Sequence, residues 1–486
     1  MNQILNIGCT IDTTDNLNKT AIIDLSEGSP RIFSYDTLNQ TADAVARGLS
    51  NQNIKINDKV AILSNNSFEY LASFYGILRL GAIPVLVNNK LSNNQIREIL
   101  VESESKLLFT DEIETYGLDF INFKSNFQSF LDHGEFSAFE PTEDSTAFLL
   151  YTSGSFGNPK GAIITHHGHA WILSKYLKTD KKWGSKRISL ISAPIYHANG
   201  LTTIEFSIAA HATVVLLSKF NPKDAILAID QFKVNTFLCV PTMLSMMFQE
   251  KELLERSQLT SVKNIKSASS AISEKLLENI NKYFPNCIFT NSYGITEVGP
   301  GLFGPHPTGL HRPSRSVGYP AAGIEYRIVD RILQIKSPSM MTSYYKKNKA
   351  ESVTEDGFFI TGDIFEVDND GFYYFIGRND DMFKSGGNRI FPTEVETILE
   401  KHPAVNASCV IALPDEIKGH KPYAFVVLEK EKVVDEEELK QFFLENGPAY
   451  QHPRSIWFLD HLPLTGTNKI NKKELYELAN KLTTEK

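Results

Sequence analysis

Short apolar strand patterns alternate with helical stretches along much of this chain. Residues 59–63 (KVAIL) are typical of a buried strand, Ser67 can cap a helix that runs to about Leu80, and Gly81 suits the exit from that helix. Residues 83–87 (IPVLV) then supply the next apolar strand. Because strand–helix–strand units normally give parallel strands with helices packed on the sheet, the sequence predicts an α/β fold.

This pattern recurs further along the chain and changes near residue 378. Four more apolar patterns each lie near a helical stretch, namely SLISAP, TVVLLS, NTFLCVP and CIFTNS. The polar, turn-prone run GRNDD then precedes a new segment of mixed α and β character. A chain of 486 residues is long enough for two or three folding units. We therefore predict a large domain at 1–379 and a small α+β domain at 380–486.

Composition and charge argue against several classes of protein. The net charge of −8 disfavours non-specific binding to nucleic acid or to an anionic membrane, so any polyanion must be bound by local groups. The sequence has no run of about 18 apolar residues, which predicts no membrane insertion, and its first residues lack a signal-peptide pattern. We expect reduced thiols and a cytoplasmic protein, because no metal-pair or CxxC spacing joins the cysteines Cys9, Cys239, Cys287 and Cys409.

A loop rich in glycine and hydroxyl groups follows the apolar strand AFLLY. It reads YTSGSFGNPKG over residues 151–161. Its glycines permit tight turns, and its hydroxyls and lysine can contact the β- and γ-phosphates of a nucleotide. The phosphate-binding candidates are Thr152, Ser153, Gly154, Ser155, Gly157 and Lys160. The alternative is a flexible surface loop, and the motif is not a Walker A loop because no Gly-Lys-Ser/Thr enters a helix here.

This loop resembles the phosphate loop of the adenylate-forming superfamily. That superfamily includes acyl-CoA synthetases, the adenylation domains of peptide synthetases and beetle luciferases. Its further motifs follow in the same order, and the resemblance spans roughly residues 20–475. The resemblance implies a large N-terminal domain of layered β-sheets with helices, followed by a small mobile α+β C-terminal domain.

The segment 291–297 (NSYGITE) resembles the second core motif of the superfamily. The resemblance places Tyr293 against adenine, Thr296 on the α-phosphate and Glu297 on Mg²⁺, and each role suits the chemistry of its side chain. A Tyr-Gly turn with a solvated glutamate is the alternative. The further nucleotide-binding residues that the resemblance implies are Asn291, Ser292, Gly294, Ser269, Ser270 and Ala271, the last three in the adenine-binding strand.

Two residues resemble the ribose contacts of the superfamily. Asp363, in the motif TGD, can accept two hydrogen bonds from a diol, and Arg378, in GRNDD, is the second contact. Asp380 falls at the position of the hinge between the two domains. The alternatives are a turn aspartate at 363 and a linker charge at 380.

The segment 384–396 (KSGGNRIFPTEVE) resembles the loop that reaches the active site for thioester formation. The resemblance places Lys384, Gly386 and Gly387 in this role, with Gly387 where a bare backbone is needed beside the thiol. The form of the segment is closer to acyl-CoA synthetases than to peptide-synthetase adenylation domains. It therefore favours free coenzyme A as the acceptor.

Lys469 resembles the lysine that bridges the attacking carboxylate and the α-phosphate during adenylation. Asn468 stands where the superfamily usually has glycine. Asparagine tolerates a left-handed backbone, so we expect the turn before the lysine to be kept.

The segment 194–200 (PIYHANG) resembles the border of the acid-binding pocket. The resemblance makes His197 a gate to the carboxylate site, and a buried structural histidine is the alternative. The pocket residues that it implies are His197, Asn199, Val240, Gly294 and Ile295. Most of them are apolar or small, which favours a fatty or aryl monocarboxylic acid over an amino acid, whose ammonium group would need a buried acid.

The resemblance implies an AMP-forming acyl-CoA synthetase that uses ATP, Mg²⁺ and coenzyme A. Its catalytic residues would be Lys469, His197, Thr296 and Glu297. Three alternatives remain. The acceptor can be the phosphopantetheine of a carrier protein, the adenylate can be oxidised as luciferases do, or the fold can serve as a non-catalytic binding module. The superfamily contains monomers and homodimers, and the sequence leaves this choice open.

Overall fold

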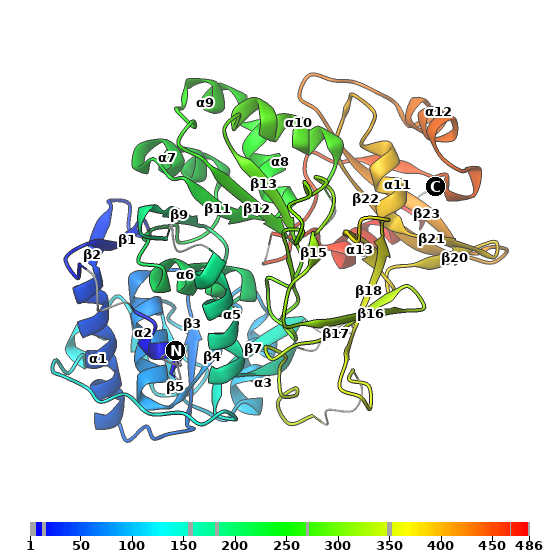
Figure 1. Ribbon diagram of the computed structural model, residues 1–486. Coiled ribbons are helices and arrows are strands. Elements are labelled where there is room, and N and C mark those ends of the chain that lie inside the picture. Colours follow the sequence, from blue (N-terminus) through cyan, green and yellow to red (C-terminus); the bar gives the residue numbers. More distant parts are fainter. Residues whose placement is uncertain are drawn as a thin grey trace.

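Five β-sheets organise the part of the chain that the computed structural model describes (Figure 1). The described residues are 6–11, 16–153, 159–179, 184–268, 272–347, 352–466 and 468–484. Two sheets of mainly parallel strands come first, two smaller antiparallel sheets follow, and a five-stranded sheet comes last. No helix in these ranges is both long and apolar enough to cross a bilayer.

The first sheet has six strands, and it confirms the predicted strand–helix–strand unit. Strands β3 and β4 pair in parallel, and helix α2 joins them, with Ser67 as its N-cap and Gly81 at its C-terminal end in a left-handed conformation (φ 81°). In spatial order the strands are β6 (Phe120–Asn122), β5 (Ser105–Thr110), β3 (Lys59–Leu63), β4 (Ile83–Leu86), β7 (Thr146–Ser153) and β8 (Pro159–Thr165).

The second sheet has seven strands, and it contains all four further strand patterns that the sequence predicts. Apart from the antiparallel edge strand β2, its pairings are parallel. In spatial order the strands are β13 (Ile288–Ser292), β12 (Asn264–Ala268), β11 (Thr236–Cys239), β9 (Ile188–Ile191), β10 (Thr213–Leu216), β1 (Thr20–Asp24) and β2 (Arg31–Ser34).

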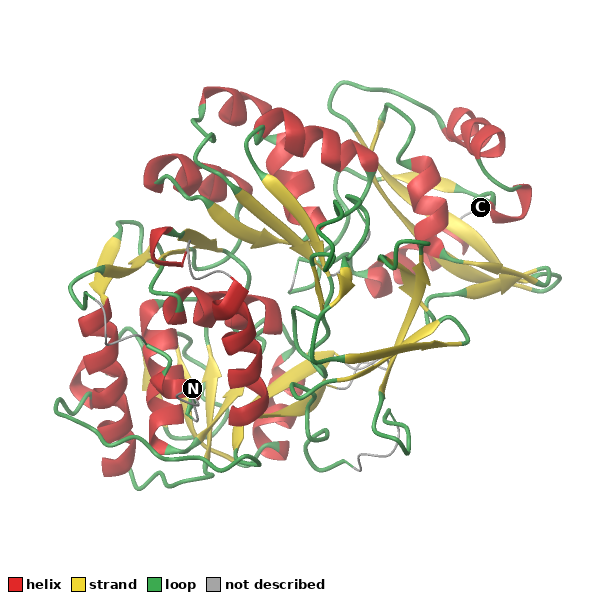
Figure 2. Cartoon of the chain, in the orientation of Figure 1, coloured by secondary structure: helices red, strands yellow, loops and turns green. Residues whose placement is uncertain are grey.

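Helices pack on both sheets, as Figure 2 shows. Their apolar side chains form the core together with those of the strands. In α1, the residues Leu38, Ala42, Val45 and Leu49 have no exposed surface. A separate core packs α7, α8 and α10 on the seven-stranded sheet. The helices before residue 300 are α1 (Tyr35–Asn51), α2 (Phe68–Leu80), α3 (Asn93–Glu102), α4 (Phe127–Phe130), α5 (His166–Thr179), α6 (Ala198–Ala209), α7 (Pro222–Phe232), α8 (Pro241–Gln249), α9 (Lys251–Arg256) and α10 (Glu274–Tyr283), with short 3-10 turns at Ile7–Cys9 and Gly184–Lys186.

Antiparallel strands follow the second sheet. They form a pair, β14 (Phe303–Gly304) with β15 (Tyr319–Pro320), and a four-stranded sheet of β16 (Glu325–Val329), β17 (Ile332–Lys336), β18 (Phe359–Val367) and β19 (Tyr373–Arg378). Strand β19 ends at Arg378, within the GRNDD run that the sequence marks as a boundary.

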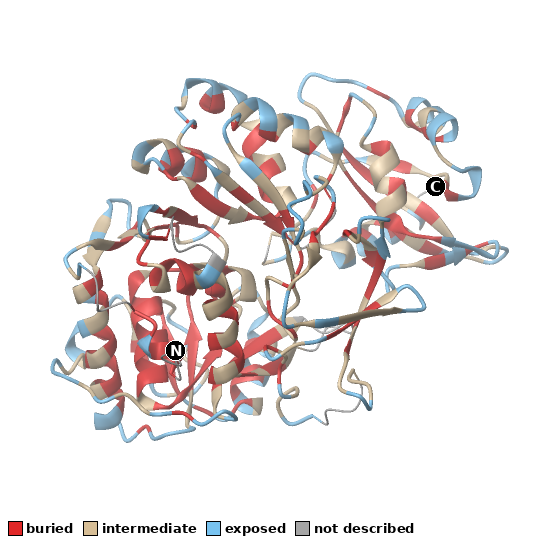
Figure 3. Ribbon diagram, viewed as in Figure 1, coloured by how far each residue is buried: buried red, intermediate tan, exposed pale blue. Residues whose placement is uncertain are grey.

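The last sheet has a core on each face, because side chains alternate along its strands. In β23, Ala424 and Val426 pack toward α11 and α12, whereas Phe425 and Val427 pack toward α13. Figure 3 shows this buried layer on the C-terminal side of the molecule. The elements are β20 (Phe383–Ser385), β21 (Asn388–Ile390), α11 (Pro392–Leu399), β22 (Val405–Asp415), β23 (Gly419–Leu428), α12 (Glu436–Asn446), β24 (Ile456–Phe458) and α13 (Lys472–Thr484), with a 3-10 turn at Ala449–Gln451.

Candidate active site

A cavity next to the predicted motifs opens at the carboxyl ends of parallel strands. Strands β12 and β13 pair in parallel, and β13 ends at Ser292, where the chain turns into the loop that continues to Ile295. Ligands of α/β proteins bind at such strand ends. The cavity has a volume of about 370 Å³ and is lined by Ile272, Asn291, Ser292, Tyr293, Gly294, Ile295, Arg315, Val317, Asp363, Glu366, Tyr374, Phe375, Ile376, Arg378 and Lys469.

Three predicted nucleotide-binding residues contact one another in this cavity. Asp363 on β18 lies opposite Arg378 on β19 in the antiparallel register. The Tyr293 hydroxyl donates a hydrogen bond of 2.5 Å to Asp363 Oδ2, and Arg378 Nε lies 3.4 Å from Asp363 Oδ1. Burial raises the pKa of Asp363 to about 6, and the charge of Arg378 acts in the opposite direction. Asp363 Oδ1 is buried and accepts no hydrogen bond within the described residues, which leaves it available to a ligand hydroxyl.

The Tyr293 ring is packed among aromatic side chains. It lies edge-on to Phe365, with ring centroids 4.9 Å apart, and nearly parallel to Phe375 at 6.2 Å. These contacts fix the ring at the cavity wall, where the sequence predicts that it stacks on adenine. Asn291 is also fixed, because its amide donates to the Arg315 carbonyl at 3.0 Å.

Lys469 reaches this cavity from a loop that docks on the large N-terminal part of the chain. The Tyr196 hydroxyl donates to the Gly466 carbonyl at 3.1 Å, and the Thr242 hydroxyl donates to the Asn468 carbonyl. Asn468 has φ 59°, which confirms that asparagine keeps the left-handed turn expected before the lysine. Lys469 as a whole is exposed at the cavity rim. The protein groups around its ammonium reduce its contact with water and lower its pKa, and the charge of Asp363 acts in the opposite direction.

His197 is the N-cap residue of α6, and it is close enough to Lys469 to be affected by its charge. Burial, followed by the charge of Lys469, lowers the pKa of His197 to about 3. A neutral imidazole at this position can border a carboxylate site without adding a charge. Val240 is buried at the start of α8, and neither His197 nor Val240 is among the residues that line the cavity.

A second, smaller cavity of about 50 Å³ lies behind Gly294. A Cβ at Gly294 would be 2.7 Å from the Cα of Pro300, which lines this second cavity, so the two cavities are neighbours. Polar residues are among those that line it, but most of the surface that faces the cavity is apolar. The lining residues are Tyr176, Arg187, Ser189, Asn199, Thr202, Thr203, Phe206, Ser207, Thr236, Phe237, Leu238, Lys266 and Pro300.

Glu297 lies beyond Thr296 in the same loop and contacts a tyrosine that the sequence analysis did not identify. The Tyr344 hydroxyl donates to Glu297 Oε1 at 2.7 Å, and Lys160 Nζ lies 5.3 Å from the centre of the Tyr344 ring. The described residues contain no cluster of three His, Cys, Asp or Glu side chains that could form a metal cage. A single carboxylate beside a phosphate site fits Mg²⁺, which usually keeps waters and phosphate oxygens as its other ligands.

Part of the predicted phosphate loop and of the adenine-binding strand lies outside the described residues, namely Gly154, Ser155, Gly157, Ser269, Ser270 and Ala271. The described ends of the phosphate loop form the β7–β8 hairpin, which terminates with Ser153 on β7 and Pro159 on β8. Thr152 lies opposite Lys160 in this hairpin, and its hydroxyl donates to the Lys160 carbonyl at 3.4 Å. The hairpin thus places both residues at one end of the loop.

The predicted thioester loop is not at the cavity. Gly386 and Gly387 form the turn of the β20–β21 hairpin with φ 56° and φ 87°, and Lys384 is exposed beside them. None of the three lines the cavity that Lys469 reaches. The structure therefore brings Lys469 into one cavity with Tyr293, Asp363 and Arg378, whereas the residues predicted for thioester formation do not line this cavity.

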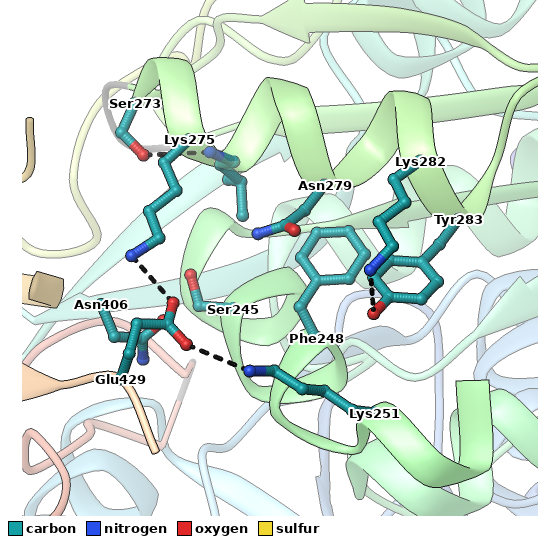
Figure 4. Close-up of a pocket in the computed structure, with 11 residues that line it drawn as sticks. Ser245, Phe248, Lys251, Ser273, Lys275, Asn279, Lys282, Tyr283, Asn406 and Glu429 are labelled. Carbon is teal, nitrogen blue, oxygen red and sulfur yellow. Dashed lines mark hydrogen bonds and ion pairs between the residues drawn. The ribbon is translucent and has the colours of Figure 1, made fainter. Parts of the chain in front are cut away.

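Two lysines of the N-terminal part hold one glutamate of the C-terminal part, as Figure 4 shows. Lys275 on α10 lies 2.8 Å from Glu429 Oε1, and Lys251 on α9 lies 3.6 Å from Glu429 Oε2. Lys275 also donates to the Val405 carbonyl at 2.6 Å. This cluster ties α9 and α10 to the last sheet.

The predicted hinge residue Asp380 and its neighbour Asp381 each form an ion pair. Asp380 Oδ2 is 3.6 Å from Arg378 Nη2, and the next residue, Asp381, pairs with Lys472 on α13 at 2.8 Å. The first pair connects this run to the four-stranded sheet, and the second connects it to the C-terminal helix.

Comparison with known proteins bears out the resemblance. Residues 12–345 match the AMP-binding enzyme family, and residues 394–469 match the AMP-binding enzyme C-terminal domain. The chain is 27% identical to 4-coumarate–CoA ligase-like 3 of Arabidopsis thaliana, over 98% of this chain and 93% of the relative. It is 30% identical to 2-succinylbenzoate–CoA ligase of Bacillus subtilis, over 89% and 90%. It is 28% identical to the fatty acid–[acyl-carrier-protein] ligase ScoC of Streptomyces coeruleorubidus, over 93% and 92%.

The fold matches solved structures over almost the whole chain. The crystal structure of the anthranilate CoA ligase AuaEII in complex with anthranoyl-AMP has a TM-score of 0.86 and 25% identity, and the match covers 99% of this chain and 98% of that one. The predicted fold class, a large α/β N-terminal domain with a small C-terminal domain, is confirmed. From the two matched segments and this fold, the chain belongs to the AMP-binding enzyme family.

Proposed function

We propose that this protein is an ATP-dependent carboxylic acid–CoA ligase that works through an acyl-adenylate and releases pyrophosphate and AMP. The observation that carries the proposal is the position of Lys469. This lysine, from the C-terminal domain, lines one cavity together with Tyr293, Asp363 and Arg378. The named CoA ligases among the relatives support the same reaction.

In the adenylating step, a carboxylate oxygen attacks the α-phosphorus of ATP, and the bond to pyrophosphate breaks. Both reactants are anions, so their approach needs cations that reduce the repulsion. Lys469 is the residue that would contact the carboxylate and the α-phosphate, and Lys160 would contact the outer phosphates. Glu297 would hold Mg²⁺, which supplies charge neutralisation to the triphosphate when it is bound.

Residues on β18, on β19 and in the 291–297 loop would bind and orient the nucleotide. Asp363, with Arg378 beside it, would accept hydrogen bonds from the two ribose hydroxyls. Tyr293 would offer its ring to adenine, and Thr296 would donate to the α-phosphate. His197, held neutral by its surroundings, would border the carboxylate of the acid without repelling or neutralising it.

In the second step, the thiol sulfur attacks the acyl carbon and AMP leaves. We propose that residues 380–486 turn about Asp380 between the two steps, so that Lys469 leaves and the turn of Lys384, Gly386 and Gly387 arrives. Support comes from the hairpin itself, since a Cβ at Gly387 would meet nothing within 4 Å. Such an open glycine turn can approach a second surface closely.

For the acid, the cavities favour a compact molecule over a long-chain fatty acid. The cavity behind Gly294 has a volume of only about 50 Å³, and Lys266 and Arg187 are among the residues that line it. A long alkyl chain would need a longer apolar pocket. Among the expected fatty and aryl acids, we therefore propose an aryl or short acid as the substrate. The names of two relatives, which refer to 4-coumarate and 2-succinylbenzoate, support an aryl acid.

A second candidate differs only in the acceptor. The ScoC relative is named for transfer to an acyl-carrier protein, so a free-standing carrier is the alternative to CoA. Both acceptors present the same phosphopantetheine thiol. The choice between them rests on surfaces outside the adenylating cavity.

A pyrophosphate-release screen tests the proposal. Purified protein is given ATP, Mg²⁺ and a panel of aryl, short dicarboxylic and fatty acids, with and without CoA. The proposal predicts acid-dependent pyrophosphate and AMP release, with an acyl-CoA product when CoA is present. Adenylate formation without acyl-CoA, but with loading of a supplied carrier protein, would favour the second candidate. No acid-dependent release across the panel would contradict both.

A further inference from the structure

The segment that carries Tyr344 is attached to both proposed phosphate-binding regions through its backbone. The Tyr345 amide donates to the Gly161 carbonyl at 2.7 Å, directly after Lys160 in the chain. The Met341 amide donates to the Glu297 carbonyl at 2.8 Å. Tyr344 is thus placed between a strand that begins beside the phosphate loop and the loop that carries Glu297.

The Tyr344 side chain makes a contact with each region as well. Its hydroxyl donates to Glu297 Oε1 at 2.7 Å, and Lys160 Nζ lies 5.3 Å from the ring centre, within the range of a cation–π contact. A carboxylate oxygen accepts and a tyrosine hydroxyl donates, so this contact is a hydrogen bond from Tyr344 to Glu297.

We propose that Tyr344 is a positioning residue that fixes the Glu297 carboxylate for Mg²⁺ bound to the triphosphate and keeps Lys160 beside it. A hydrogen bond to one oxygen restricts the rotation of the carboxylate, so that the carboxylate meets the ion without first being ordered. The backbone hydrogen bonds already join the segments, so a purely structural tie would not need the hydroxyl. This inference rests on the proposed function, because it assigns a role within the same site.

The substitution Tyr344→Phe isolates the hydroxyl, because phenylalanine keeps the ring near Lys160. The neighbouring Tyr345→Phe is a matched control, since the Tyr345 hydroxyl contacts the exposed Glu104 at 3.4 Å. The first readout is equilibrium binding of ATP without acid, titrated with and without Mg²⁺. We expect Tyr344→Phe to reduce the gain in ATP affinity that Mg²⁺ gives by about 3- to 10-fold, the size expected for the net contribution of one hydrogen bond. Tyr345→Phe should match the wild type.

The second readout is acid-dependent pyrophosphate release over a range of free Mg²⁺. Tyr344→Phe should raise the half-saturating Mg²⁺ concentration by a similar factor, while thioester formation from a supplied acyl-adenylate stays at the wild-type rate. A mutant with the wild-type Mg²⁺ dependence in both readouts would overturn the inference. A wild type without acid-dependent release would instead contradict the proposed function, and the binding titration would still test Tyr344.

Other substitutions at Tyr344 keep the inference testable if Tyr344→Phe unfolds the protein, and a double-mutant cycle adds a test if it folds. Tyr344→His retains a ring and a hydrogen-bond donor, and should keep the Mg²⁺ dependence closer to wild type than Tyr344→Leu does. Where Tyr344→Phe is folded, its effect should largely disappear in the background of Glu297→Gln, because the two residues act through one interaction. Additive effects of the two substitutions would overturn the inference.

Discussion

The Tyr196 hydroxyl donates a hydrogen bond to the backbone carbonyl of Gly466, across 270 positions of the sequence. Thr242 makes a similar contact with the Asn468 carbonyl, so residues far apart in the N-terminal domain hold both sides of the turn before Lys469. These contacts are made with the backbone, and they hold the loop independently of its side chains. The placement of the lysine at the cavity therefore depends on a few specific donors.

Removing one of these donors should slow adenylation. Tyr196→Phe loses one hydrogen bond in a partly buried contact, a net cost of about 0.5–1.5 kcal/mol to the docked loop. We expect acid-dependent pyrophosphate release to fall about 2- to 10-fold. Thioester formation from a supplied acyl-adenylate should not fall, because that step needs the loop released. An equal loss in both assays, with an unchanged thermal midpoint, would show that the contact has no such role.

ATP binding should depend on pH through Asp363. Burial raises the pKa of this carboxyl from 3.8 to about 6, so it gains a proton as the pH falls through about 6. Hydroxyl donors of a ribose favour the ionised form, so binding should weaken below that pH. We expect the ATP affinity of the wild type to fall between about pH 7.5 and about pH 5. The affinity of Asp363→Asn should be weaker at high pH and converge with the wild type at low pH.

The ratio of the two affinities removes the titration of ATP itself, which affects both proteins equally. In the absence of nucleotide, the unfolding free energy changes with pH in the opposite direction to the ATP affinity. An ionised carboxyl with a raised pKa costs stability, so its contribution lowers the unfolding free energy as pH rises from 3.8 to about 6. A ratio of affinities that does not change with pH would rule out Asp363 as the group responsible.

The ion pairs between the two domains should favour the adenylating arrangement. The Glu429 side chain is 19% exposed and contacts Lys275 and Lys251. Glu429→Gln removes the charge and keeps the shape, and we expect pyrophosphate release to fall about 2- to 5-fold, with a smaller difference from wild type at high salt. Lys282→Met is the control. Lys282 lines the pocket of Figure 4 together with Glu429, but it donates to Tyr283 on its own helix. Identical behaviour of the two variants would refute the role of the pair.

Restricting the hinge should separate the two half-reactions. Proline at position 380 fixes φ near −65° and limits the turn of the C-terminal domain. We expect Asp380→Pro to keep acid-dependent pyrophosphate exchange and to lose most thioester formation. Asp380→Ala removes the contact with Arg378 but leaves the backbone free, so it should keep both activities. Equal loss of both activities in Asp380→Pro would contradict a hinge at this residue.

The sequence predicted the local elements well, because their signals are local. Ser67 and Gly81 bound α2 as their capping preferences indicate, and Asp435 caps α12 through the Glu438 amide. The parallel pairing of β3 with β4 follows from the helix that joins them. Asn468 adopts the left-handed conformation that its side chain tolerates.

The sequence did not predict the contacts that assemble the site. Tyr344 lies in a segment without a functional motif, and its place beside Lys160 comes from hydrogen bonds to β8 that no local pattern encodes. The contact of Tyr196 with Gly466 likewise depends on how two domains dock. Most residues that line the small cavity behind Gly294 were missed for a similar reason, because they come from several strands and helices that meet only in the fold.

Acid-dependent pyrophosphate release by Lys469→Ala tests the central claim most directly. Loss of one group that stabilises developing charge typically costs about 100-fold or more in rate. We predict a loss of that size, together with near wild-type thioester formation when the acyl-adenylate is supplied. A variant that releases pyrophosphate at the wild-type rate would contradict the claim that this lysine closes the adenylating site.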